Sequence, residues 1–277
     1  MRLGITMFMT DQSIGPVDLA RAVEERGFSS LYLPEHTHIP VSRRTPAPTG
    51  DEQLADEYRR TLDPFVALAA AAASTETIEL GTGICVLAQH EPIVTAKTIA
   101  TLDRLSAGRF VFGIGFGWNV EEMEDHGIDV RRRRELVREH LLAMRRLWAD
   151  EVASFDGEFV RFEPSWSWPK PLQQPGPPVL IGGAAGPKLF SAVADYADGW
   201  IPIGGAGVRA ALPDLHRAAE AAGRDPSALR IVPFGVLPDP GKLDYYASLG
   251  IDQVVLRIPT GPADAVLPVL DEHARLV

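Results

Sequence analysis

Short apolar runs alternate with longer amphipathic segments along the whole chain. The apolar runs are bounded by turn residues and lack the polar alternation of half-exposed strands, which indicates strands that are buried on both faces. The runs expected to form strands are 2–8, 29–34, 78–87, 109–115, 178–182, 199–203, 230–236 and 253–258. The helical patterns that follow them are 16–27, 63–75, 92–106, 133–149, 187–197, 207–222, 240–249 and 262–275.

This alternation predicts an α/β fold in which helices cover a parallel sheet. With eight repeats, closure into a (β/α)8 TIM barrel is the economical arrangement, and an open doubly wound sheet is the alternative. Segment 133–149 supports the helical assignments, because Val137, Leu141 and Met144 recur on one helical face. Proline near the start of several helical segments also supports them, since a missing N–H costs little there.

Two segments interrupt the alternation. Residues 37–61 follow the second strand and are polar, with a proline- and glycine-containing stretch at 45–51. Residues 150–177 precede the fifth strand and contain a hairpin pattern at 155–159. Long insertions in compact domains are often lids or binding loops, so we expect both to border the carboxyl end of the barrel, with surface decoration as the alternative. We find no linker, and residues 1–277 are expected to form a single domain.

Composition narrows the class of protein. The net charge of −10 argues against nucleic acid or an anionic membrane as a partner. No apolar run is long enough to span a bilayer, and the first residues lack the apolar region of a signal peptide. Cys85 is the only cysteine, which excludes an intrachain disulfide and fits a reducing compartment. We therefore expect a cytoplasmic protein with a small-molecule substrate, and the sequence leaves a homodimer open.

Glycine accumulates where the third, fourth and fifth strands end. Active sites of α/β barrels form at the carboxyl ends of the strands, and glycine lets the backbone approach a flat or charged ligand. Gly182 and Gly183 stand directly before a helix, whose free N–H groups suit a phosphate; a tight turn is the structural alternative. The glycine run at 113–117 does not match the spacing of a dinucleotide fingerprint.

His36 and His38 follow the second strand and raise the question of a metal site. Such sites need further ligands from later strands, but the fifth, sixth and eighth strands end in glycine and proline, so we expect no metal. No lysine lies on an expected strand, which argues against a Schiff base. What remains is a glycine-lined site with His36 and the adjacent Glu35, a set that suits cofactor chemistry.

Several segments match one family signature in chain order. They are Glu35–His36, Leu80–Leu87, Pro92, Ala100–Phe110, Phe112–Trp118 and Pro178–Gly183. Together they resemble the luciferase-like monooxygenases, a superfamily of TIM-barrel enzymes that includes bacterial luciferase. Its members use reduced FMN with oxygen, or the deazaflavin coenzyme F420 for hydride transfer. The resemblance covers essentially the whole chain.

The resemblance implies roles for individual residues. His36 corresponds to the histidine beside the reacting ring, and with Glu35 it forms the catalytic pair that we expect, His36 serving as a general acid or base. Gly83–Ile84 corresponds to a non-prolyl cis peptide behind the cofactor ring. The implied cofactor-binding residues are Gly83, Ile84, Gly115, Phe116, Gly117, Trp118, Gly182, Gly183, Ala184 and Ala185, the last four forming the phosphate-binding turn.

Two departures from the family bear on the cofactor. Bacterial luciferase has a phosphate-binding arginine where this chain has Phe116, which weakens the FMN interpretation. The sugar-phosphate dehydrogenases of the family have a catalytic glutamate where this chain has Trp118. The favoured hypothesis is an oxidoreductase that transfers a hydride between F420 and a small organic substrate. The alternatives are an FMN-dependent two-component monooxygenase and a non-catalytic flavin-binding homologue.

The deazaflavin carries an anionic tail, and arginines flank the expected site. Four of them, Arg131 to Arg134, precede or begin the fourth helix. Others lie in the insertion after the second strand, namely Arg43, Arg44, Arg59 and Arg60. Arginine suits carboxylates and phosphates, so we expect these residues to receive the tail, with a solvated surface as the alternative.

Overall fold

The computed structural model of the chain describes residues 1–47 and 53–277. The strands are β1 (Arg2–Thr6), β2 (Ser30–Leu33), β3 (Glu79–Thr82), β4 (Phe110–Ile114), β5 (Ala153–Asp156), β6 (Arg161–Ser165), β7 (Val179–Gly182), β8 (Gly199–Ile201), β9 (Arg230–Ile231), β10 (Phe234–Val236) and β11 (Gln253–Arg257). The α-helices are α1 (Pro16–Glu25), α2 (Pro64–Ala72), α3 (Pro92–Leu105), α4 (Val120–Asp125), α5 (Arg133–Ala149), α6 (Pro187–Tyr196), α7 (Val208–Ala221), α8 (Pro240–Ser248) and α9 (Ala263–His273). Short 3-10 helices are η1 (Asp56–Arg60), η2 (Leu87–Gln89), η3 (Pro226–Ala228) and η4 (Ala274–Leu276).

The main sheet is parallel throughout, with the order β10-β11-β1-β2-β3-β4-β7-β8-β9. β9 and β10 are two parts of the expected strand 230–236. β9 pairs with β8, and the Val232 N–H continues this side by donating to the Trp200 carbonyl. β10 pairs with β11, and the Val255 N–H donates to the Pro233 carbonyl. Because one strand pairs on both sides, the sheet closes, and the expected (β/α)8 barrel is confirmed.

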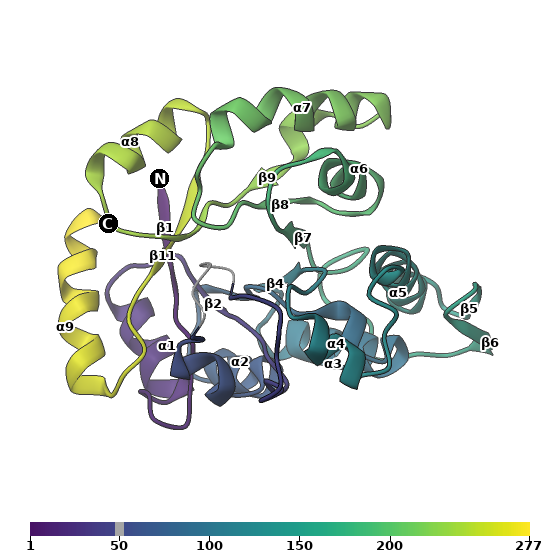
Figure 1. Cartoon of the computed structure of the whole chain (residues 1–277), viewed down its shortest axis with the longest axis horizontal. Coiled ribbons are helices and arrows are strands. Elements are labelled where there is room, and N and C mark those ends of the chain that lie inside the picture. The colour runs from purple at the N-terminus through teal and green to yellow at the C-terminus, as the bar shows by residue number, and fades with distance from the viewer. Residues whose placement is uncertain (48–52) are drawn as a thin grey trace.

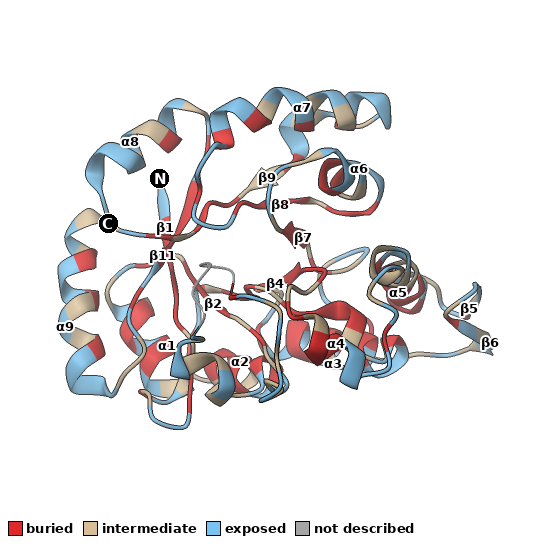
Figure 2. Cartoon of the chain, in the orientation of Figure 1, coloured by how far each residue is buried: buried red, intermediate tan, exposed pale blue. Residues whose placement is uncertain are grey.

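The helices lie outside the strands, and the core fills the space between them (Figures 1 and 2). The face of α5 that the sequence indicates is buried, with Val137, Leu141 and Met144 all at 0% exposure. Trp148 near the end of α5 is also buried, and its Nε1–H donates to the Ala96 carbonyl of α3 at 3.0 Å. Across the described residues, no helix is both long enough and apolar enough to cross a membrane.

Two local features differ from the sequence pattern. The third strand ends at Thr82, earlier than expected. The peptide bond that follows, Gly83–Ile84, is cis, and this prediction is confirmed. Cys85 then rejoins the sheet through a bridge to Ile114. The short helix α4 was not predicted, because its six residues are too few to show a helical period.

The described residues of the first insertion, 37–47 and 53–61, lie at the carboxyl end of the barrel, as expected. Its residues 48–52 fall outside the described part of the chain. η1 ends next to the second strand, where the Thr61 hydroxyl donates to the His36 carbonyl at 2.9 Å. The described part of the insertion therefore lies over the ends of the strands that carry the candidate site.

The second insertion, 150–177, precedes the fifth strand of the barrel as expected, but the expectation that it borders the carboxyl end of the barrel is wrong. Its β5–β6 hairpin lies beyond α5, at the edge of the molecule (Figure 1), where the Phe159 N–H donates to Glu139 of α5 at 2.6 Å. Further on, the Gln173 side chain donates to the Phe110 carbonyl at the start of β4. The physical reason is that α5 returns the chain to the amino end of the barrel before the insertion begins.

Candidate active site

Gly83 and Ile84, between the end of β3 and Cys85, form a bulge in the strand. The Ile84 side chain points from this bulge into the barrel. Ile84 packs against the buried cluster inside the strands, which includes Phe234. A Cβ placed on Gly83 would lie 2.2 Å from Phe234 Cζ, so no other residue fits there without a shift of the phenyl ring. The main chain of the bulge is thus fixed from the inside of the barrel.

The space at the other strand-end glycines is filled by protein side chains. A Cβ on Gly115 would lie 2.5 Å from Ile84 Cδ1, and one on Gly182 would lie 2.6 Å from Ile84 Cγ2. A Cβ on Gly117 would lie 2.8 Å from the sulfur of Met123, and its φ is +74°. On the side of the missing Cβ, these glycines therefore accommodate Ile84 and Met123, and their assignment to the cofactor stays a prediction.

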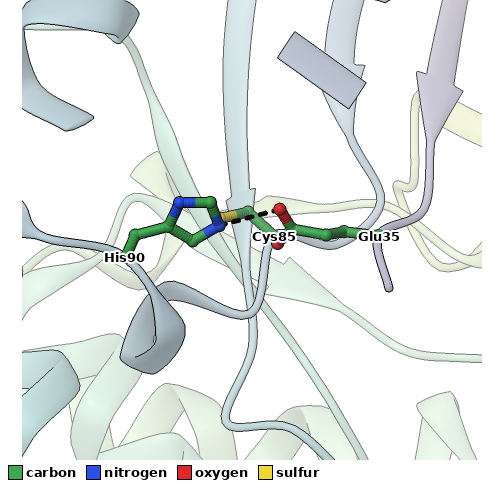
Figure 3. Close-up of side chains that lie close together, drawn as sticks. All are labelled: Glu35, Cys85 and His90. Carbon is green, nitrogen blue, oxygen red and sulfur yellow. Dashed lines mark hydrogen bonds and ion pairs between the residues drawn. The ribbon is translucent and has the colours of Figure 1, made fainter. Parts of the chain in front are cut away.

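The Glu35 carboxylate binds the main chain next to this bulge. One oxygen accepts the Val86 N–H at 2.7 Å, and the other lies 2.7 Å from His90 Nε2. Cys85 completes a compact group, since its sulfur and the ligand atoms of Glu35 and His90 all lie within 4.8 Å of one another (Figure 3). Such a set could ligate zinc, but the Glu35 oxygens already have partners in the protein. Glu35 therefore faces the bulge and not the ring of its neighbour His36.

Two side chains of this group, His90 and Cys85, have shifted pKa values. Burial alone would lower the pKa of His90, but the hydrogen bond and charge of Glu35 outweigh it and raise the pKa above 6.5. Burial, with the charge of Glu35, raises the pKa of the Cys85 thiol well above its usual value. The arrangement favours a protonated His90 beside a neutral Cys85 thiol.

His36 is paired with a residue that the sequence did not indicate. Its Nδ1 lies 2.8 Å from Glu122 Oε2, and both side chains are nearly buried, at 7% and 2% exposure. Glu122 also accepts the Thr37 N–H at 3.1 Å and an N–H of the Asn119 amide at 3.4 Å. The signal that could have identified Glu122 is its place, shortly after the glycine-rich end of β4.

Glu122 is a stabilised anion. Burial acts to raise the pKa of its carboxyl group, but the hydrogen bond and charge of His36, with the donors Thr37 and Asn119, lower it below 4.5. A carboxylate at Nδ1 orients the imidazole and favours a proton on that nitrogen. Nε2 of His36 has no hydrogen-bond partner within the described part of the chain, so it is the nitrogen available for chemistry.

The turn between β7 and α6 is open. No atom lies closer than 3.4 Å to a Cβ built on Gly183, and none lies within 4 Å of one on Gly186. Ala184 and Ala185 are exposed. Unlike the glycines of the other strand ends, this turn has room beside its backbone for a ligand.

Arg134 lies beside the expected cofactor-binding residues. Its guanidinium stands over the Phe116 ring, 4.0 Å from the centroid. Its Nη1 is buried and has no hydrogen-bond partner within residues 1–47 and 53–277. Burial, followed by the charge of Arg133, lowers the pKa of Arg134, as expected for a cation without a neighbouring carboxylate. It lies in the first turn of α5, the helix that packs against α6.

Most other arginines that were expected to receive an anionic tail already have partners. Arg132 binds Glu135 and Glu158, at 2.6 and 2.5 Å. Arg60 binds Asp56 at 2.6 Å. Arg59 and Arg44 also lie beside carboxylates. The structure therefore shifts attention to Arg134.

A cavity of about 350 Å³ lies at the opposite end of the barrel. It is lined by residues at the starts of the late strands, among them Pro178, Asp198 and Arg230. Asp198 binds Arg145 at 3.2 Å, and Arg230 binds Glu79 at 2.9 Å. Because these charges satisfy one another, the polar groups of this cavity have a structural role.

The site can now be set beside known proteins. The sequence model of the family described as luciferase-like monooxygenase matches residues 15–237. The chain belongs to this family. The likeness that the sequence suggested at Leu80–Leu87 and Phe112–Trp118 is therefore confirmed.

Similar proteins match nearly the whole chain. The uncharacterized protein Rv0953c of Mycobacterium tuberculosis is 48% identical over 267 residues, which are 95% of this chain and 94% of that protein. The F420-dependent hydroxymycolic acid dehydrogenase of the same species is 29% identical over 276 residues, 96% of this chain and 69% of that protein. The crystal structure of monooxygenase RslO1 from Streptomyces bottropensis has a TM-score of 0.78 at 22% identity, covering 99% and 98% of the two chains. This last likeness supports the barrel fold.

Proposed function

We propose that this luciferase-like protein is an oxidoreductase that moves a hydride between coenzyme F420 and a small organic substrate. The observation that carries the proposal is the pairing of His36 with Glu122 at the carboxyl end of the barrel, 2.8 Å apart. A histidine held through Nδ1 can take up or release a proton at Nε2. Proton transfer to or from a substrate oxygen is what hydride transfer at the neighbouring carbon requires.

The residues present fit the cofactor. The open turn at Gly183–Gly186, at the start of α6, would bind the phosphate with backbone N–H groups. Arg134, whose Nη1 is buried without a partner, would add a cation. Gly83 and Ile84 would support the flat ring with main-chain atoms. When bound, the deazaflavin supplies a hydride carrier that reacts poorly with oxygen.

We assign His36 and Glu35 different roles. His36 would hold or release the substrate proton at Nε2. Glu35, whose oxygens bind Val86 and His90, would act as a positioning residue that fixes the bulge. Trp118, whose ring centroid lies 5.6 Å from that of His36, would exclude water from the reacting atoms.

The relative named as an F420-dependent dehydrogenase supports the deazaflavin. The likeness to monooxygenase RslO1 favours a second candidate, an FMN-dependent two-component monooxygenase. Titration of the purified protein with each cofactor, followed by fluorescence, separates the two. We expect F420 to bind more than roughly tenfold more tightly than FMN, and F420 to be reduced or oxidised in the presence of substrate.

Two other results have a clear meaning. FMN binding as tight as F420 binding, with oxygen-dependent turnover, would establish the monooxygenase. Tight binding of either cofactor without turnover on any organic substrate would leave a non-catalytic flavin-binding homologue.

A further inference from the structure

A thiol, an imidazole and a carboxylate converge beside the bulge that follows β3. The sulfur of Cys85 and the ligand atoms of Glu35 and His90 all lie within 4.8 Å of one another, with the side chains directed toward a common point (Figure 3). Among residues 1–47 and 53–277, this is the one group of His, Cys, Asp and Glu side chains in which three such atoms come so close. The sequence raised the question of a metal at His36 and His38, but the structure assembles a better set of ligands elsewhere.

The three side chains come from separate elements, and the fold holds them from several sides. Glu35 follows β2, and Cys85 follows the bulge, where its N–H donates to the Gly113 carbonyl of β4 at 2.8 Å. His90 follows η2, and the Phe65 ring packs against its imidazole with 5.6 Å between the centroids. Ligands that are held in place beforehand lose little conformational freedom when a cation binds.

The existing partners of Glu35 leave one carboxylate oxygen for a cation. Oε2 accepts the Val86 N–H, whereas Oε1 lies 2.7 Å from Nε2 of His90. The partner of Oε1 is therefore itself a ligand, and a cation between the two atoms would replace the proton that joins them. The Val86 N–H would keep its bond to Oε2 and orient the carboxylate, as outer partners of metal ligands do.

We propose that Glu35, Cys85 and His90 form a binding site for Zn²⁺. Thiolate sulfur, imidazole nitrogen and carboxylate oxygen are the ligand atoms of protein zinc sites, whereas Mg²⁺ and Ca²⁺ prefer oxygen. Three protein ligands leave the fourth position of a tetrahedral ion to water or another small ligand. Glu35 and Cys85 are almost fully buried, but 20% of the His90 side chain is exposed, so the ion would enter past His90.

Protons and charges balance when the ion binds. The S–H bond of Cys85 and the Nε2–H bond of protonated His90 break, and both protons pass to the solvent. The Cys85 thiolate and the Glu35 carboxylate then neutralise the two positive charges of the ion. The charge of Asp63 acts on both Cys85 and His90, and it adds a negative potential around the cation.

Cobalt gives a direct test, because Cys85 is the only cysteine of the chain. Titration of the chelator-treated protein with Co²⁺ should show one ion per chain and a thiolate-to-cobalt charge-transfer absorption in the near ultraviolet. Since no second thiol exists, this band identifies Cys85 as a ligand without any substitution. Zn²⁺ should displace Co²⁺ and remove the band, and calorimetry should give a Kd on the order of micromolar or below.

Two substitutions locate the site, and a third is the matched control. Cys85→Ser should abolish the band and weaken Zn²⁺ binding by roughly 100-fold or more, because the thiolate is lost. His90→Gln, at the partly exposed ligand, should weaken Zn²⁺ binding by roughly tenfold or more. His126→Ala removes an exposed histidine whose ring lies 5.5 Å from that of His38, a second place where histidines come close, and it should leave the affinity unchanged.

Thermal unfolding gives an independent measurement. Zn²⁺ at about a hundredfold excess over its Kd should raise the Tm of the wild type by several degrees and leave that of Cys85→Ser unchanged. If Cys85→Ser does not fold, the band of the wild type and the weaker binding of His90→Gln decide the question. No binding, a cobalt spectrum without the thiolate band, equal affinity in Cys85→Ser, or loss of binding in His126→Ala would each overturn the inference. None of these measurements needs a cofactor or a substrate, so their outcome is separate from that of the proposed function.

Discussion

Glu122 Oε2 lies 2.8 Å from Nδ1 of His36, although 86 positions separate the two residues in the sequence. His36 follows β2, and Glu122 lies on α4, the short helix after β4. The contact joins two strand ends across β3, and it orients the one imidazole that we assign to proton transfer.

Replacing His36 with alanine should lower turnover by roughly 100-fold or more, because the proton acceptor is lost. Cofactor affinity, measured by fluorescence titration, should change far less. His38→Ala is the control, since this neighbouring histidine is 42% exposed and binds Asp125; its turnover should stay near that of the wild type. An equal loss of turnover and cofactor affinity in His36→Ala would make His36 a binding residue.

Glu122→Gln should lower turnover by roughly tenfold or more, because His36 loses its charged partner. It should also change how stability depends on pH. The pKa of Glu122 is lowered in the folded protein, so its contribution to stability is present above pH 4.5 and is lost as the pH falls through the folded pKa. Urea unfolding should therefore show the largest difference between wild type and variant near neutral pH. A difference that persists unchanged in acid would contradict this.

The His90–Glu35 pair should have the opposite pH dependence. The pKa of His90 is raised above 6.5 on folding, so its contribution is fully present below that pH and is lost as the pH rises through the folded pKa. The free energy of unfolding of the wild type relative to His90→Gln should fall as the pH rises over this range. Glu35→Gln should abolish the same pH-dependent part, and the prediction fails if it does not.

Gly182→Ala should destabilise the protein by about 1–3 kcal/mol, because the new Cβ would lie 2.6 Å from Ile84 Cγ2. In an Ile84→Ala background the same change should cost less, and this coupling is measurable by a double-mutant cycle of urea unfolding. Gly186→Ala has no atom within 4 Å of the added Cβ, and it should stay within about 0.5 kcal/mol of the wild type. Additive costs at Gly182 and Ile84 would contradict the assigned contact.

Arg134→Ala should weaken F420 binding by roughly tenfold, since an anion loses a partly buried cation. The remaining affinity should depend less on salt. Arg131→Ala removes an exposed arginine from the same run and should change the affinity by about twofold at most. Equal effects of the two substitutions would favour a diffuse attraction by surface arginines.

The sequence by itself determined the barrel and the position of the turn at Gly182–Ala185 along the chain. Both depend on patterns that are local in sequence, since strand and helix periods, and glycines before a helix, can be read within a short window. The cis peptide at Gly83–Ile84 followed from the resemblance to the family. The motif around His36 was recognisable for the same reason. Its partner Glu122 was missed, because α4 is too short to show a helical period and only its place after the glycine-rich end of β4 pointed to it.

Only the tertiary structure decided what the side chains at the strand ends contact. Closure of the barrel brings Ile84 against Gly115 and Gly182, so the space that these glycines leave is taken by protein. It directs Glu35 to Val86 and away from the ring of His36. Such contacts join residues from different strands, and their geometry depends on strand order, register and packing, which a local pattern of hydrophobic and polar residues does not encode.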